Sequence, residues 1–102
     1  MNDTARELYL YTCNCFPAWQ AVEAAARNYE RKRAKGVYDS ALAAKGLAYA
    51  VELAAKAYII EHCSGERWHD IFPAGERRDV AAAIVVDLEA EWAAGNSWTL
   101  AA

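Results

Sequence analysis

Apolar residues between Asp39 and Gly65 recur so often that they cover nearly every face of a helical wheel. The larger ones are Leu42, Leu47, Tyr49, Val51, Leu53, Tyr58, Ile59 and Ile60. Because a helix that is apolar all round is usually buried, the pattern predicts a central helix with other helices packed around it. Lys45, Glu52 and Lys56 interrupt the run, which excludes the roughly 20 apolar residues of a membrane span.

Two further segments show a single apolar stripe with helical spacing. Residues 17–35 begin with a proline at the first helical position and stop before Gly36, and residues 76–94 stop before Gly95. Their stripes are Trp19, Val22, Ala26 and Tyr29 in the first helix, and Val80, Ile84, Leu88 and Trp92 in the second. One apolar stripe predicts a helix that packs on the core with one face.

The segments at the start and in the connector are shorter. Residues 3–12 include the β-rich run LYLY, but Asp3 or Thr4 can cap a helix, and Glu7 three positions after Thr4 completes a capping box, so a helix is favoured. Residues 66–75 form a connector whose apolar members Trp68, Ile71 and Phe72 are expected to fold back and plug one end. The predicted fold is a single all-α domain over residues 1–102. It is a small bundle of three long helices plus a short N-terminal helix around a buried central helix.

Small residues inside the central helix predict a tight helix contact. Gly46 is a poor helix former and would cost about 1 kcal/mol relative to alanine if it served no packing role. Together with it, a ridge of small side chains is formed by Ala43, Ala50, Ala54 and Ala57. Another helix can approach closely along such a ridge.

Composition adds limits rather than chemistry. The 102 residues include 4 Trp, 6 Tyr and 2 Phe, which must fill much of a core otherwise rich in alanine. A net charge of −3 makes free nucleic acid a secondary expectation. The first residues lack a basic stretch before an apolar run, so no signal peptide is expected, and three cysteines without framework spacing fit a reducing cytoplasm.

A positive cluster stands out on this acidic chain: Arg27, Arg31, Lys32, Arg33 and Lys35, at the end of the second predicted helix. Cations are favoured at a helix C-terminus because they complement the helix dipole, which is a purely structural role. The functional alternatives are contact with an acidic protein surface or with phosphates.

The last helix carries the opposite charge in its C-terminal half, at Asp87, Glu89 and Glu91, where carboxylates oppose the dipole. A solvated face is favoured, because exposed ion pairs contribute little. The other interpretations are pairing with the basic cluster inside the fold and contact with a cationic partner.

Candidate chemistry gathers around the cysteines and histidines. Cys13, Cys15, Cys63, His62 and His69 are zinc-ligand types, but Cys13 and Cys15 lack the two-residue gap of zinc fingers, and buried structural thiols are favoured. No metal and no cofactor is predicted.

A nucleophilic site would need Cys63 or Ser64 beside His62 or His69, with Glu61 or Asp70 as orienting carboxylate. The residue types are present, but their spacing is unspecific, so a small cysteine-dependent enzyme is a minor alternative and no catalytic residue is assigned. Of the tryptophans, Trp98 lies beyond the last helix stop, where it either covers an open end or serves as a binding anchor.

Four segments together carry a resemblance: ELYLY, NYERKRAKGVYD, AKGLAYAVELAAKAY and ERWHDIFPAGERRDVAAAIV. In that order they resemble a family of small helical proteins from bacteriophages and mobile elements, and the similarity covers most of the chain. The Cys-x-Cys pair is not a feature of that family. The resemblance implies a genetic setting rather than a reaction.

That setting implies a non-catalytic accessory protein in the cytoplasm of a host bacterium, which binds a host protein complex and inhibits a defence system, as an anti-CRISPR protein does. The expected partner-binding residues are Arg27, Arg31, Lys32, Arg33, Lys35 and Trp98. The alternative is a nucleic-acid-associated module that uses the same basic segment. A homodimer stays open, because the small-residue ridge could also join two copies.

Overall fold

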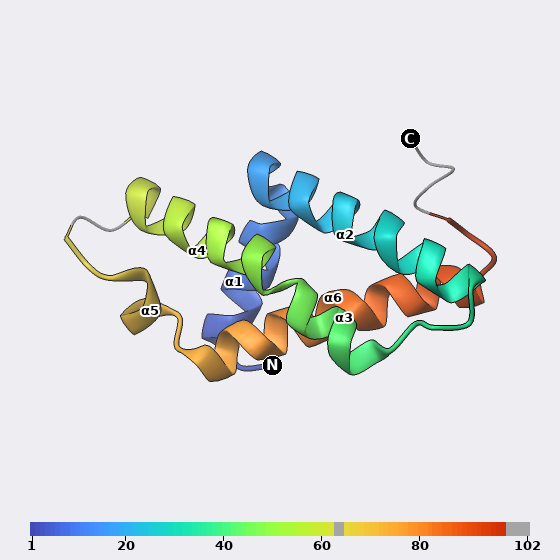
Figure 1. Ribbon diagram of the computed structural model, residues 1–102. Coiled ribbons are helices and arrows are strands. Elements are labelled where there is room, and N and C mark those ends of the chain that lie inside the picture. Colours follow the sequence, from blue (N-terminus) through green and yellow to red (C-terminus); the bar gives the residue numbers. More distant parts are fainter. Residues whose placement is uncertain (63–64, 98–102) are drawn as a thin grey trace.

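The computed structural model describes residues 1–62 and 65–97, and within these ranges every regular element is a helix (Figure 1). The long helices are α1 (Asp3–Asn14), α2 (Phe16–Ala34), α4 (Ala48–His62) and α6 (Ala74–Ala93). The shorter α3 (Ser40–Gly46) lies between α2 and α4, and α5 (Trp68–Ile71) lies between α4 and α6. The all-α prediction is therefore confirmed, and the strand alternative for the first segment is wrong.

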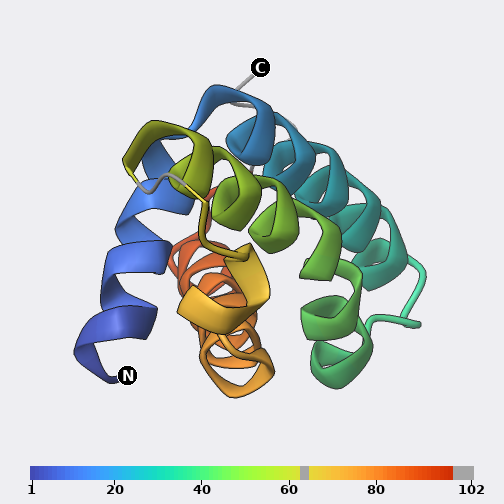
Figure 2. The ribbon, with the colours of Figure 1, turned by 90° about the vertical axis from the view of Figure 1, so that its left-hand side faces the viewer.

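Helix α4 makes the most connections in the fold. It packs against α1, α2, α3, α5 and α6. Seen along the long axis of the molecule, α2 and α4 lie side by side in one layer, and α6 lies beneath them between α1 and α3 (Figure 2). Helix α4, in the segment predicted to be central, thus contacts every other helix that the structure describes.

The expectation that this segment is buried all round is wrong. Leu42 is 61% exposed, Tyr49 is 65% exposed and Ile60 is 86% exposed. The buried face of α4 consists of Ala50, Val51, Ala54 and Ala55. Small side chains let the neighbouring helices approach closely, so the core here is built from alanine while several large apolar side chains point to solvent.

The central segment is also divided, because α3 ends at Gly46 and α4 begins at Ala48. The Tyr29 hydroxyl reaches across from α2 and donates a hydrogen bond to the Ala43 carbonyl at 2.9 Å. A Cβ at Gly46 would overlap this hydroxyl oxygen. Gly46 therefore permits the close approach that the small-residue ridge predicted, at the point where the helix is interrupted.

Helix ends follow local sequence signals with one change. Asp39 caps α3 as expected, since its side chain accepts a hydrogen bond from the Leu42 amide at 3.1 Å. The cap of α1 is Asn2 rather than Asp3 or Thr4, and it accepts from the Ala5 amide at 2.8 Å. After α2, Gly36 adopts φ +73°, a left-handed conformation that glycine reaches without strain.

The apolar stripes of the two flanking helices form much of the core. All four predicted residues of the α6 stripe are buried, and in α2 the stripe is buried at Val22, Ala26 and Tyr29. Trp19 is only half-buried, because Ala18 occupies the adjacent buried position. In the connector, Phe72 is 1% exposed and meets the Tyr58 ring edge-on with centroids 5.0 Å apart, so the predicted plug is confirmed.

Replacing Gly46 with alanine tests the contact with Tyr29. Although alanine favours a helix by about 1 kcal/mol, the added methyl group displaces a buried, hydrogen-bonded hydroxyl, and overpacking of this kind costs roughly 1–3 kcal/mol. We expect Gly46→Ala to lower the free energy of unfolding by about 1–2 kcal/mol in urea titrations followed by circular dichroism. In a Tyr29→Phe background the same change should cost less. A Gly46→Ala variant more stable than the parent would contradict this packing.

Candidate functional site

The cationic segment at the end of α2 is the first candidate surface. We call Arg31, Lys32, Arg33 and Lys35 the basic turn. Arg31, Lys32 and Lys35 are exposed, and none of the three forms an ion pair with a carboxylate in the part of the chain that the structure describes. Their charge is therefore open to a partner.

The other two predicted contact cations are already engaged. The Arg27 guanidinium lies 3.7 Å from the Glu23 carboxylate one turn earlier. The Arg33 guanidinium lies over the Trp92 ring of α6, 5.1 Å from its centroid, in a cation–π contact. Arg33 therefore joins α2 to α6, although its side chain remains partly accessible.

The C-terminal ends of α2 and α6 meet at this junction (Figure 1). A pocket of about 420 Å³ lies beside it. Its lining is Glu30, Arg33, Ala34, Trp92, Asn96 and Ser97. Glu30 accepts hydrogen bonds from Trp92 Nε1 at 3.2 Å and from Ser97 Oγ at 2.7 Å. The bond to Glu30 satisfies the indole N–H of the buried Trp92. Trp98, the predicted anchor, lies outside the described residues.

The acidic half of α6 does not pair with the basic turn among the described residues. Asp87 accepts a hydrogen bond from Tyr9, and Glu89 accepts from Tyr38 at 2.7 Å and from Ser40. Glu91 accepts from Asn96 at 2.7 Å. Neutral hydroxyl and amide donors, rather than cations, thus occupy the carboxylates that the sequence predicted to be simply solvated or ion-paired.

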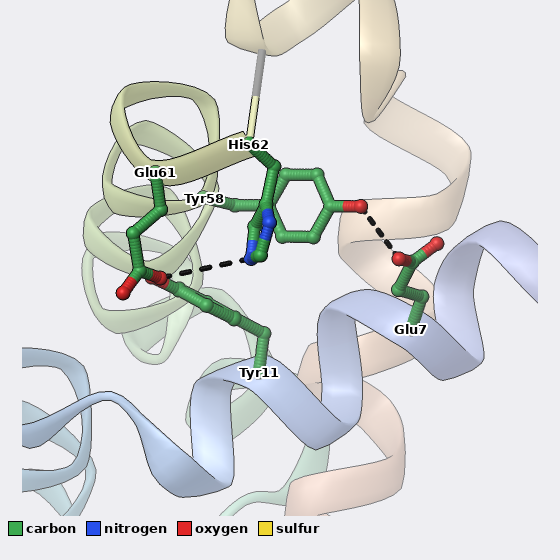
Figure 3. Close-up of polar contacts among 5 residues, drawn as sticks. All are labelled: Glu7, Tyr11, Tyr58, Glu61 and His62. Atoms are coloured by element: carbon green, nitrogen blue, oxygen red, sulfur yellow. Dashed lines mark hydrogen bonds and ion pairs between the residues drawn. The ribbon is translucent and has the colours of Figure 1, made fainter.

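The same type of bond links α1 to α4 (Figure 3). Tyr58 donates to Glu7 at 2.5 Å, and Tyr11 donates to Glu61. The Tyr11 and Tyr58 rings meet edge-on with centroids 5.3 Å apart. Two tyrosines from opposite helices therefore each reach a carboxylate on the other helix, which ties the two helices in both directions.

These bonds change the acidity of the tyrosines. The hydrogen bond to Glu61 raises the pKa of Tyr11 to about 12. Burial and the hydrogen bond to Glu89 raise the pKa of Tyr38 to about 12, and the bond to Asp87 raises the pKa of Tyr9 well above its ordinary value. A phenolate facing a carboxylate would be repelled, so folding holds the proton on each hydroxyl.

The histidine at the end of α4 belongs to this cluster. His62 Nε2 lies 3.7 Å from the Glu61 carboxylate, and the His62 ring lies beside Tyr58 with centroids 4.5 Å apart (Figure 3). His69 instead contacts Trp68, and no hydrogen bond or ion pair in the described ranges links His69 or Asp70 to this cluster. The nucleophile candidates Cys63 and Ser64 lie outside the described residues.

The two described cysteines are free and half-buried at the α1–α2 junction. Burial raises the pKa of the Cys13 thiol above its ordinary value, which disfavours the thiolate that metal binding and nucleophilic attack require. Within residues 1–62 and 65–97, no three His, Cys, Asp or Glu side chains are arranged to hold a metal ion.

Comparisons with known proteins add no family to these observations. No protein-family model, curated protein or solved structure matches the chain. No helix within the described ranges is both long and apolar enough to cross a membrane.

The raised tyrosine pKa values predict a loss of stability in alkali. Tyr38 keeps its proton to about pH 12 in the folded chain, whereas an unfolded tyrosine loses it near its ordinary value of 10.0. Between these values unfolding releases a proton, so the free energy of unfolding falls as pH rises. Tyr38→Phe should make this fall shallower, because roughly one proton fewer is released on unfolding. Denaturant titrations at several pH values measure the slope.

Tyr49→Phe is the matched control for this experiment, because Tyr49 is 65% exposed. It removes a tyrosine hydroxyl from an exposed position, and so measures the general effect of a Tyr→Phe change. An equal slope in the parent and in Tyr38→Phe would contradict the raised pKa that burial and the hydrogen bond to Glu89 give Tyr38.

Proposed function

We propose that this chain is a non-catalytic binding protein that docks on an acidic surface of a host protein complex through the basic turn. The observation that supports this proposal is the exposure of Arg31, Lys32 and Lys35 without a carboxylate partner in the described ranges. Acidic groups elsewhere in the fold are held by hydroxyl and indole donors, as Glu89 and Glu30 are. The positive charge of the turn is thus not neutralised from within.

Two features favour a protein partner over nucleic acid. The chain carries a net charge of −3, which opposes the approach of a polyanion at long range. The basic turn also ends a helix, where the C-terminal pole of the dipole contributes roughly half a negative charge. A few cations in this setting can orient a protein contact, but they neutralise too few phosphates for strong binding to nucleic acid.

The proposed biological role follows from the resemblance to small phage and mobile-element proteins. We propose that binding inhibits a host defence complex, as an anti-CRISPR protein does, by occupying a surface that the complex needs. Occlusion requires no catalytic group, and the proposal assigns none. The contacting residues are Arg31, Lys32 and Lys35, with Arg33 at the edge of the pocket beside Trp92.

A charge-reversal pair tests this function. Arg31→Glu with Lys32→Glu should reduce capture of a protein complex from host bacterial lysate by about tenfold or more, because the turn then repels an acidic surface. The control is Arg6→Glu with Arg67→Glu, at two exposed arginines outside the turn. Like the turn variant, it shifts the formal net charge from −3 to −7. Capture is measured by quantitative mass spectrometry, with nucleic acid assayed in the same eluates.

Each outcome of this experiment is decisive. A protein complex retained by the parent and the control but lost by the turn variant supports the proposal. Equal capture by all three proteins contradicts a role for the turn. An eluate dominated by nucleic acid that is released at high salt favours the nucleic-acid module instead.

A further inference from the structure

A groove floored by alanines runs between α6 and the α3–α4 junction, away from the basic turn. In the end-on view, α3 and α6 lie side by side beneath α4 (Figure 2). The groove has a volume of about 530 Å³. Its lining is Ala41, Ala44 and Ala48 from the α3 side, Ala74, Ala81 and Ala82 from the α6 side, and Lys45, Arg77 and Arg78. We call this the alanine groove.

The groove exists because the apolar residues on both of its walls are all alanines. Ala81 is 4% exposed and Ala44 is half-buried, so these two form the floor. Ala41, Ala48 and Ala82 are exposed along the walls. Larger residues at these positions would have filled the space, and the alanines leave room for apolar side chains from another molecule.

The charged side chains that line the groove are all cationic. Arg77 is fixed in place, because its Nε donates to the Phe72 carbonyl at 2.9 Å and its guanidinium lies 4.8 Å from the centroid of the Trp68 ring. Lys45 and Arg78 are exposed and pair with no carboxylate among the residues that the structure describes. On a chain with a net charge of −3, this is a local surface complementary to acids.

We propose that the alanine groove binds an amphipathic helix of a partner protein, with the apolar stripe of that helix on the alanines and its acidic residues beside Lys45 and Arg78. Lys45 lies on the α3 side and Arg78 on the α6 side, so cations flank the apolar floor on both walls. A helix with acidic residues on both sides of an apolar stripe matches this arrangement.

The length of the groove fits the same occupant. The α6 wall from Ala74 to Ala82 extends about 12 Å at helical rise, which is about two turns of a bound helix. Two turns present apolar side chains at positions i, i+3 or i+4, and i+7. This surface is separate from the basic turn, so the inference stands or falls independently of the proposed function.

A peptide selection tests the proposal without knowledge of the natural partner. The probe is a displayed library of helix-forming peptides of about four turns, with the contact face and its flanks randomised, selected on the immobilised full chain. We expect enrichment of sequences with apolar residues at i, i+3 or i+4, and i+7, and with Asp or Glu beside them. Fluorescence polarisation then compares the affinities of enriched peptides for variants.

Two variants locate the binding. Ala82→Trp fills the groove from an exposed position of α6, and Lys45→Glu with Arg78→Glu reverses the charge of its rim. Each should weaken the binding of the enriched peptides by about tenfold or more. The effect of the rim variant should be largest at low salt. Ala24→Trp, at an exposed alanine of α2, is the control and should bind as the parent does. If Ala82→Trp fails to fold, the affinity of the peptides for the rim variant decides whether they bind in the groove.

Other results would overturn the proposal. These are the absence of enrichment, enriched peptides without acidic residues, or peptides that bind Ala82→Trp as tightly as the parent. A homodimer in light scattering that Ala82→Trp dissociates would show that a second copy, rather than a partner helix, fills the groove.

Discussion

Hydrogen bonds that tyrosine hydroxyls donate to carboxylates join neighbouring segments of this fold. Many of the buried apolar residues are alanines, which let helices approach closely but bury little apolar area each. Aromatic rings supply the missing volume, and a ring near the edge of a small bundle brings its hydroxyl to the surface of the next helix. Hydroxyls donate to acids across a helix interface from Tyr9, Tyr11 and Tyr58. Tyr38, which lies between α2 and α3, donates to Glu89 of α6. The alanine core and the tyrosine hydrogen bonds therefore act together in the packing of the helices.

This arrangement determines which charges remain for binding. Among the described residues no ion pair joins Asp87 or Glu89 to the cations at the end of α2, and the basic turn is exposed. Because the apolar side chains on its walls are small, the alanine groove stays open between α3 and α6, and cations line it. An acidic protein thus carries two surfaces with exposed cations. These are the two surfaces on which we propose that acidic protein partners dock.

The local features of the fold could be predicted from sequence, and the long-range ones could not. The α6 stripe and the Asp39 cap are set by residues within a few positions of each other, so periodicity and capping rules found them. The close approach at Gly46 depends on Tyr29 from another helix, and the exposure of Tyr49 and Ile60 depends on which face of α4 the alanines occupy. The tyrosine bonds join residues 50 to 78 positions apart, which no local pattern encodes. Of the predicted contact residues, Arg31, Lys32 and Lys35 are exposed, whereas Arg27 and Arg33 are engaged within the fold.

The central claim, that hydroxyls rather than cations hold the acids of α6, is tested most directly by two double-mutant cycles on Glu89. One cycle combines Tyr38→Phe with Glu89→Gln, and the other combines Lys32→Gln with Glu89→Gln, each measured by urea unfolding at neutral pH. We expect a coupling of about 0.5–1.5 kcal/mol for Tyr38 and Glu89, and additivity within about 0.5 kcal/mol for Lys32 and Glu89. A larger coupling for Lys32 than for Tyr38 would show that the basic turn is neutralised inside the fold and that the hydroxyls do not hold these acids.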